Sequence, residues 1–357
     1  MSRDVLIEIL DLARWAPSGD NTQPWRFEIV ADDRLAIHGY DTREHVLYDF
    51  DGHPSQMAHG ALIETLRIAA SGYQLVCEWR VRPGSPDNAP VYDIQLRSVP
   101  DLLVDPLLPH IEKRVVQRRP MRMTPLTSEQ RNVLSLAPGS NYSVQFFENM
   151  TDRMRVARLL WDNAYIRLTC PEAYQVHRDI IEWGARFSHD RLPEEAIGVD
   201  PMTAKLMKWV MQSWSRVEFF NRYLLGTVVP RIQLDFIPAL ACAGHLLLKP
   251  RKPLNSMNDY VEAGMAMQRL WLTATSLGLH LQPEMTPVIF RWYARAGRKI
   301  SANSEINTEI ELVASRFESL AEASNDQSFA FFCRIGQSTV PTSRSLRKSL
   351  SQLLNLN

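Results

Sequence analysis

The chain has 357 residues, 45% of them apolar, and its 40 lysines and arginines balance 40 aspartates and glutamates. This composition predicts a sizeable core in one large domain or two ordinary ones, and it argues against disorder. A formal charge of zero gives no field that would recruit nucleic acid or an acidic membrane surface, so we expect neither as a partner.

Apolar residues from Val5 to Ala13 follow helical spacing, and this helix should end near Pro17. Residues 25–38 predict a hairpin, and residues 57–72 predict a helix with small and apolar residues on one face. Strands follow in residues 78–84 and 92–99. This order is typical of an α+β fold rather than the regular alternation of a Rossmann domain.

A second cycle of similar elements begins near Pro106. Thr127 with Gln130 forms a capping-box pattern for a helix through Leu136. The next stretch, LAPGSNYSVQFFEN, has the same order of residue types as WAPSGDNTQPWRFEIV near the N-terminus. Residues 261–283 parallel residues 57–79, because each is a helix rich in small residues, closed by a glycine and followed by a strand.

We therefore interpret the chain as two copies of one α+β module, covering residues 1–105 and 106–357. The second copy carries a helical insertion at about residues 163–230, which is rich in tryptophan, arginine and long apolar residues. The insertion either adds helices that cover the core or acts as a lid over a pocket.

Cysteine, histidine and serine patterns restrict the chemistry. The four cysteines are scattered without a C-x-x-C pair, which argues against a zinc site or a disulfide framework and suits a reducing cytoplasm. No histidine pair has helical spacing with a carboxylate partner, so we expect no metal. No G-x-S-x-G elbow is present. Three acidic residues in the first eleven do not fit a signal peptide, and residues 236–248 are too short for a membrane helix of ~20 residues.

Two segments carry a resemblance to a known family. ARWAPSGDNTQPWRF resembles the A-P-S-x-x-N-x-Q-P-W turn of the FMN-dependent nitroreductase family, and QRRPMRMTPLTSEQ resembles that family's R-R-S-x-R segment. GLHLQPEMTP and CRIGQSTVPTSR are weaker matches that follow in the family's order. The resemblance implies a nitroreductase-like α+β fold, with mixed or antiparallel sheets flanked by helices, an FMN cofactor and NAD(P)H as co-substrate.

The order of the two main motifs departs from the family pattern. In the family both motifs lie in one module with the arginines first, whereas here the turn lies in the first module and the arginines lie in the second. This arrangement resembles the tandem, pseudo-dimeric branch, which includes Acg-type flavin-sequestering proteins and MoeY-type proteins. It implies one FMN site per chain, built from both halves, in a monomeric pseudo-dimer or a homodimer.

The resemblance assigns the FMN phosphate to Arg118, Arg119 and Arg122, with Arg118 foremost. Arginine suits this role because its planar fork of donors matches a phosphate dianion. The alternative is a solvated basic face. Pro120 stands where the family often has serine, so a hydroxyl contact is lost there. Arg344 either completes the phosphate site or belongs to a basic tail.

In the turn, Pro17 precedes Ser18 and Asn21, which the resemblance assigns to the isoalloxazine edge or the ribityl hydroxyls. The alternative for both polar side chains is a turn that caps itself. We expect Gln23 to fix the turn's own backbone and Trp25 to be a core or interface anchor.

By resemblance alone, Gln282, Pro283 and Glu284 line the pocket. We assign no catalytic residue, because a bound flavin supplies the hydride chemistry and the protein orients it. The leading hypothesis is a cytoplasmic FMN-dependent NAD(P)H oxidoreductase that acts on a small acceptor. One alternative is an Acg-like FMN-sequestering protein without turnover, and another is a cofactor-biosynthesis role with a partner enzyme, as in MoeY-type proteins.

Overall fold

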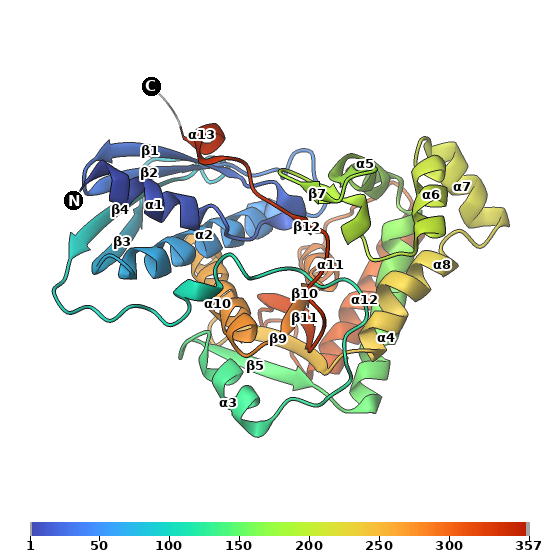
Figure 1. Ribbon diagram of the computed structural model, residues 1–357. Coiled ribbons are helices and arrows are strands. Elements are labelled where there is room, and N and C mark those ends of the chain that lie inside the picture. The colour runs from blue at the N-terminus through green and yellow to red at the C-terminus, as the bar shows by residue number, and fades with distance from the viewer. Residues whose placement is uncertain (1, 355–357) are drawn as a thin grey trace.

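The structure is a computed structural model that describes residues 2–354. The fold contains two four-stranded antiparallel sheets, each packed against helices, the first at the upper left of Figure 1 and the second below it. The predicted α+β class is confirmed. Among residues 2–354, no helix combines the length and the apolar character needed to cross a membrane.

The first sheet is built from the N-terminal part of the chain. Its strands have the order β1-β2-β4-β3, and every neighbouring pair is antiparallel. The predicted helices and hairpin are all present. The elements are α1 (Arg3–Ala13), β1 (Trp25–Ala31), β2 (Arg34–Gly39), α2 (His53–Ser71), β3 (Leu75–Val81) and β4 (Val91–Ser98).

Only one face of the first sheet is covered. Phe27, Ile37 and Tyr92 are paired across three strands and are fully buried in a core that includes residues of α1 and α2. Their strand neighbours Glu28 and Asp93 lie on the opposite face, where ion pairs and partial exposure replace packing. This alternation is typical of an antiparallel sheet with one solvated side.

The second sheet has the order β5-β9-β11-β10, again antiparallel throughout. In both sheets, the first strand in the chain lies at one edge, followed by the second, the fourth and then the third, so the two sheets have the same strand order. Thr127 and Gln130 form the predicted capping box at the start of α3. The elements are α3 (Ser128–Leu136), β5 (Tyr142–Phe147), β9 (Gly244–Pro250), α10 (Met257–Ser276), β10 (His280–Pro283) and β11 (Phe331–Gly336).

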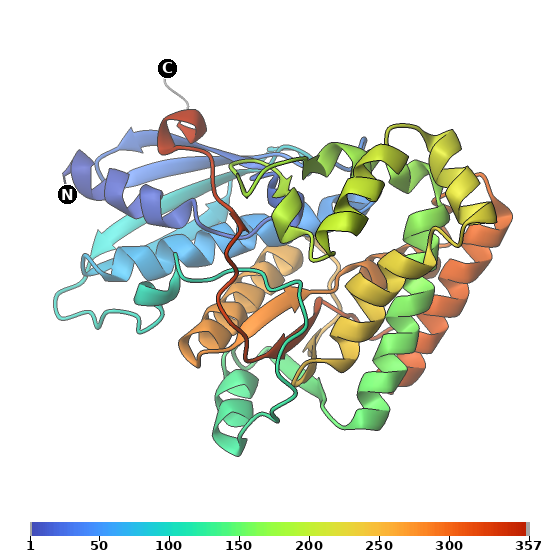
Figure 2. The ribbon, with the colours of Figure 1, turned by 45° about the vertical axis from the view of Figure 1, so that its right-hand side comes forward.

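Helices inserted between the strands cover the second face of this sheet. The long helices α4 (Met150–Thr169) and α12 (Ser304–Ala321) run side by side next to the sheet (Figure 2). Phe317 of α12 packs on Phe332 of β11 with ring centroids 5.0 Å apart. As a result, every residue of β11 is buried.

The helical segment between β5 and β9 is longer than the predicted 163–230. It begins at Met150, where Asn149 caps α4, and a second pair of helices between β10 and β11 was not predicted. The remaining elements are α5 (Pro171–Ile180), β6 (Ile181–Glu182), β7 (Phe187–Ser188), β8 (Leu192–Pro193), α6 (Pro201–Val210), α7 (Trp214–Tyr223), α8 (Val228–Arg231), a π-helical turn (Ile232–Phe236), α9 (Ile237–Leu240) and α11 (Thr286–Arg295).

Helices α2 and α10 cross in contact with each other (Figure 1). A Cβ atom on Gly60 would lie 1.8 Å from the carbonyl oxygen of Val261, and one on Gly264 would lie 1.9 Å from the carbonyl oxygen of Met57. Each glycine therefore faces the residue three positions before the other glycine. Only glycine permits so close an approach of two backbones.

The chain ends in a C-terminal strap, residues 337–349, which runs from β11 back across the molecule to the first sheet (Figure 1). Within it, β12 (Arg344–Ser345) pairs in parallel with β7. The strap leads to α13 (Leu350–Leu353), and Leu354 pairs with Phe27 of β1. The strap thereby connects the second sheet to the first.

Candidate functional site

The Ala16–Trp25 turn has an unusual backbone. Asp20, Asn21 and Gln23 have φ angles of 50°, 63° and 51°, a left-handed conformation that few residues other than glycine adopt. Local hydrogen bonds hold this shape: Ser18 Oγ accepts from the Gln23 amide at 3.0 Å, and Gln23 Nε2 donates to the Asn21 carbonyl at 3.0 Å. A Cβ added to Gly19 would meet nothing within 4 Å, so the turn is open at that point.

A buried histidine holds the far end of the turn. His59 Nε2 donates to the Pro24 carbonyl oxygen at 2.7 Å, and its Nδ1 accepts from the Tyr92 hydroxyl at 3.0 Å. Burial lowers the pKa of His59 to about 4, so the ring is neutral at pH 7. Trp25 is fully buried in the first core.

The C-terminal strap inserts Arg347 under the turn. Its guanidinium donates to the Ala16 carbonyl at 3.0 Å and to Asn21 Oδ1 at 2.9 Å, and the amide of Lys348 donates to Gln23 Oε1 at 2.9 Å. The side chains of Asn21 and Gln23 are therefore bonded within the chain. Arg347 was not among the predicted site residues, yet it is buried.

A loop from the helical segment covers the turn. Within this loop, residues 187–198, the carbonyl of His189 accepts from Gln23 Nε2 at 2.8 Å. The carbonyl of Ala196 accepts from Arg118 at 3.4 Å. This loop thus contacts both the turn and residues 117–122, which we call the arginine segment.

The arginine segment and the turn face each other, although they are far apart in the sequence. Burial lowers the pKa of Arg118 to about 10, while the charge of Asp20 raises it and the charge of Arg334 lowers it. Burial in turn raises the pKa of Asp20, and Arg118 opposes this shift. Arg119 and Arg122 are exposed.

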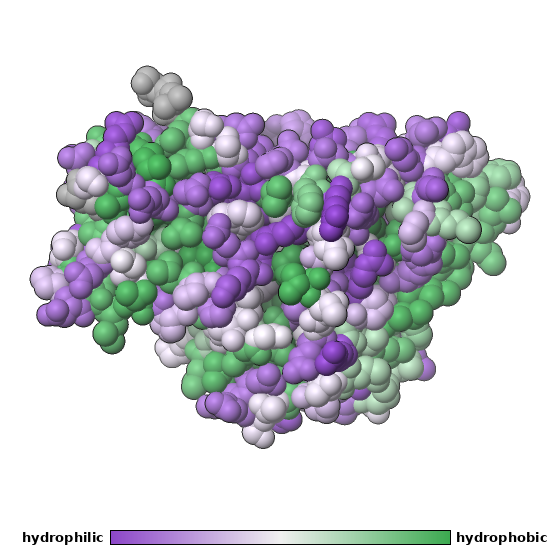
Figure 3. Space-filling model, viewed as in Figure 1, coloured by the Kyte–Doolittle hydropathy of each residue, from purple (hydrophilic) through white to green (hydrophobic). Residues whose placement is uncertain are grey.

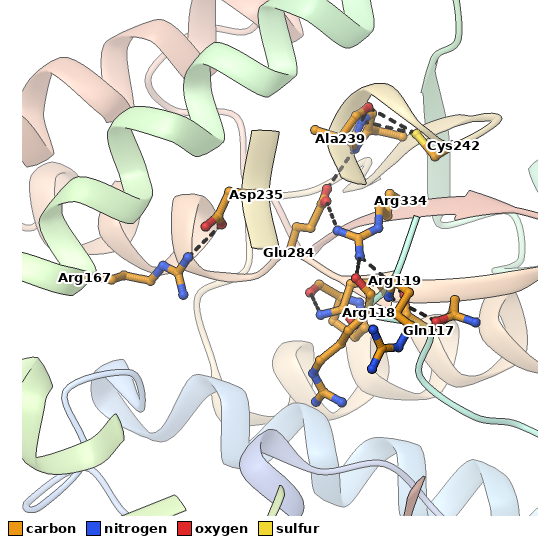
Figure 4. Close-up of polar contacts among 12 residues, drawn as sticks. Gln117, Arg118, Arg119, Arg167, Asp235, Ala239, Cys242, Glu284 and Arg334 are labelled. Atoms are coloured by element: carbon orange, nitrogen blue, oxygen red, sulfur yellow. Dashed lines mark hydrogen bonds and ion pairs between the residues drawn. The ribbon is translucent and has the colours of Figure 1, made fainter. Parts of the chain in front are cut away.

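Arg334 anchors the arginine segment to the second sheet. Its guanidinium donates to the Arg118 carbonyl at 2.5 Å and forms an ion pair with Glu284 at 3.3 Å (Figure 4). His245 forms a second ion pair with Glu284 at 2.8 Å. Burial alone would lower the pKa of His245, but Glu284 and the nearby Cys242 raise it to about 10, so the ring is a buried cation.

Gln282 lies beside Arg334 on the same face of the sheet, because the two residues are paired across β10 and β11. Its Nε2 donates to the Pro283 carbonyl at 2.9 Å. Its buried Oε1 has no hydrogen-bond partner among residues 2–354. This face of the sheet therefore carries, beside Arg334, a buried hydrogen-bond acceptor that no described residue satisfies.

A second arginine cluster surrounds Trp15. Arg114 donates to the Trp15 carbonyl at 2.8 Å, and Arg344 donates to the Glu112 carbonyl at 3.0 Å while its guanidinium lies 4.9 Å from the Trp15 ring centroid. Burial, together with neighbouring arginines, lowers the pKa of Arg114 well below its usual range and that of Arg347 to about 9. The cluster is therefore an excess of buried positive charge.

Three buried donors in this cluster lack a partner within the described part of the chain: Arg114 Nε, Arg344 Nε and Trp15 Nε1. Unpaired buried donors beside uncompensated cations are the chemistry of an anion site. Of these arginines, only Arg344 was predicted from the sequence, because no local pattern separates Arg114 or Arg347 from an ordinary basic face. Residues 2–354 contain no group of three or more His, Cys, Asp or Glu side chains that could hold a metal ion.

Comparison with known proteins supports the resemblance for the N-terminal part. Residues 1–92 match the model of the Nitroreductase family, and the fold is nitroreductase-like. A search of curated proteins gives no match.

Several solved structures are similar at low identity. A nitroreductase with bound FMN from Desulfitobacterium hafniense is 13% identical, with 71% of this chain and 100% of that chain covered and a TM-score of 0.37. The FMN-dependent nitroreductase NfnB from Mycobacterium smegmatis in complex with NADPH is 14% identical, with 70% and 96% covered and a TM-score of 0.36. A nitroreductase-like family protein from Bacillus cereus is 8% identical, with 71% and 96% covered and a TM-score of 0.35.

Proposed function

We propose that this protein is an FMN-binding oxidoreductase that transfers hydride from NAD(P)H to a small acceptor. The observation that carries the proposal is the approach of the Ala16–Trp25 turn to Arg118, two segments that the family resemblance assigns to one flavin. The family match over residues 1–92, which includes the turn, also supports it.

The residues of the site fit an FMN molecule. Its phosphate is a dianion, and the unpaired donors of Arg114, Arg344 and Trp15 supply both the charge and the hydrogen bonds it requires. Arg118 is the other candidate, although Asp20 partly balances its charge. We assign the edge of the flavin to Pro17, Ser18 and Gly19 of the turn, which is open at Gly19, and to the unsatisfied Oε1 of Gln282.

When bound, FMN would supply the hydride chemistry, and the protein would bind, orient and enclose it. Arg334 holds the arginine segment in place, and His59 holds the turn. Loop 187–198 limits the access of water from the side that it covers.

We also propose that residues 1–105 and 106–357 are two copies of one module that form a pseudo-dimer. The equal strand order of the two sheets and the equivalent glycine contacts of α2 and α10 support this duplication. Gly60→Ala and Gly264→Ala should each destabilise the fold by about 3 kcal/mol, because the new Cβ meets a backbone oxygen. Gly19→Ala is the matched control, and strongly unequal losses at Gly60 and Gly264 would contradict equivalent contacts.

A second candidate function is FMN sequestration without reductase turnover. It is favoured by loop 187–198, which is bonded to both the turn and Arg118. A loop fixed over a flavin bound between these segments would hinder the approach of a nicotinamide. The two functions share a cofactor and differ only in access to it.

The visible spectrum of the purified protein, supplemented with FMN and then with NADH or NADPH, tests both functions. We expect flavin that co-purifies or binds and is bleached by a nicotinamide. Bound flavin that neither nicotinamide bleaches would favour sequestration. Failure to bind FMN would overturn both proposals.

Paired substitutions locate the phosphate. Arg344→Ala and Arg118→Ala are compared by titration of flavin fluorescence, with exposed Arg119→Ala as control and circular dichroism as the check on folding. We expect Arg344→Ala to lose about tenfold or more in FMN affinity, because a hydrogen bond to a charged group contributes about 1.5–3 kcal/mol. A loss confined to Arg118→Ala would move the phosphate to the arginine segment.

A further inference from the structure

Helices α6, α7 and α8 expose an unusual amount of apolar surface. Figure 3 shows hydrophobic surface at the end of the molecule where α7 and α8 lie in Figure 1. We call residues 201–230 the outer hairpin. Its large apolar side chains that are at least 47% exposed are Met202, Leu206, Trp209, Phe219, Tyr223, Leu224, Leu225 and Val229.

Helix α7 is the extreme case, because none of its residues is buried. Trp214 at its start packs on Tyr174 of α5, with ring centroids 5.6 Å apart. Its other aromatic side chains contact one another and α6: the ring centroids of Phe219 and Tyr223 are 5.2 Å apart, and those of Phe220 and Trp209 are 5.8 Å apart. Large exposed apolar surfaces are rare on isolated globular proteins and mark sites of interaction. Something outside the described chain should therefore cover α7.

Backbone strain at the end of α7 supports the same conclusion. Leu225 has a φ of 52°, a left-handed conformation that glycine usually supplies after a helix, yet its side chain is 71% exposed. The amide of Gly226 donates to the Phe220 carbonyl at 2.9 Å and closes this turn. The turn leaves the leucine side chain on the surface, where an external apolar partner would cover it.

The charge of the outer hairpin indicates which partner. Residues 201–230 contain Lys205, Lys208, Arg216 and Arg222 but a single acid, Glu218, whereas the whole chain is neutral. The balance over the whole chain hides this local excess. Exposed Trp, Tyr, Phe and Leu interleaved with Lys and Arg are the composition of helices that lie in the interface of an anionic bilayer.

We propose that the outer hairpin is a membrane-binding surface that inserts its aromatic and leucine side chains at the headgroup level of an anionic lipid bilayer. Phe219, Tyr223 and Leu224 supply the apolar contact, and Lys205 and Lys208 supply attraction to acidic headgroups. The proposal concerns a peripheral contact and does not depend on FMN binding.

Co-sedimentation with phosphatidylcholine vesicles, prepared with and without phosphatidylglycerol, tests the proposal on the full chain. We expect binding to the anionic vesicles and little to the neutral ones. Phe219→Ser combined with Leu224→Ser should weaken binding about tenfold for each side chain, from the apolar area withdrawn from the bilayer. Lys205→Glu combined with Lys208→Glu should weaken it by at least about tenfold.

Leu103→Ser is the matched control, because Leu103 is 88% exposed and lies outside the outer hairpin. Circular dichroism checks that each variant folds. Sedimentation velocity tests the alternative that a second copy of this chain covers the outer hairpin, because it measures whether the protein is a dimer in solution. The proposal is overturned if anionic vesicles do not bind at low salt, or if the wild type is a dimer that the Phe219/Leu224 variant converts to a monomer.

Discussion

His59 and His245 are both fully buried, one in each half of the chain, but at pH 7 His59 is neutral and His245 is a cation. His59 contacts only neutral groups, a carbonyl and a hydroxyl, and burial lowers its pKa to about 4. His245 contacts a carboxylate that outweighs burial and raises its pKa to about 10. Burial alone therefore does not decide whether a histidine is charged, because the neighbouring group does.

The two histidines also support the two parts of the candidate site in different ways. His59 bonds the Pro24 carbonyl of the turn directly. His245 acts through Glu284 and Arg334, which in turn holds the Arg118 carbonyl. A neutral hydrogen bond thus supports one part, and a buried ionic network supports the other.

Removal of Glu284 should have the largest effect. Glu284→Ala leaves the cations His245 and Arg334 buried without a counter-charge, and we expect a loss of about 3–5 kcal/mol in the free energy of unfolding at pH 7. Urea denaturation measures it. Glu78→Ala is the control, because its pair with Arg97 is mostly exposed and should contribute less than about 1 kcal/mol. Equal losses in the two variants would show that the network does not carry charge.

His59→Leu should cost less, because it removes a neutral partner. The Pro24 carbonyl and the Tyr92 hydroxyl lose their hydrogen bonds, and we expect a loss of about 2–3 kcal/mol. Tyr92→Phe removes one of these bonds and should cost about 1 kcal/mol. If His59→Leu proved no worse than Tyr92→Phe, the bond to Pro24 would have no role in holding the turn.

The sequence predicted the local parts of this site and missed the long-range ones. The turn, the capping box at Thr127 and the core position of Trp25 each depend on a few neighbouring residues. The contacts of Arg334 and Arg347 depend on segments that meet only in the folded chain. A buried arginine in a strand or tail has the same local sequence as an exposed one, so neither could be recognised.

Stability should respond to pH with opposite sign at the two histidines. The folded pKa of His59 is below its unfolded value of about 6.5, so its contribution is present above pH 6.5 and is lost as the pH falls toward 4. The folded pKa of His245 is raised, so its contribution is present below pH 6.5 and is lost as the pH rises toward 10.

Each slope is at most about 1.4 kcal/mol per pH unit. The free energy of unfolding is measured against pH for each protein. The difference between wild type and His59→Leu gives the contribution of His59, and the difference between wild type and His245→Gln gives that of His245. Subtraction is needed because His53 and His177 are partly buried, and desolvation lowers their pKa values to about 4 and about 3. If both contributions changed with pH in the same direction, the assigned charge states would be wrong.

Ser18→Ala should give the smallest effect and tests whether the turn is held locally or by its buried supports. The substitution removes the acceptor of the Gln23 amide, and we expect a loss of about 1 kcal/mol. Because His59 and Arg347 hold other carbonyls of the same turn, the fold should remain intact. Thermal unfolding by circular dichroism measures the change, with Thr22→Ala as the control, since Thr22 bonds the exposed carbonyl of Gly19. A loss as large as that of His59→Leu would mean that Ser18, rather than the buried histidine, determines the shape of the turn.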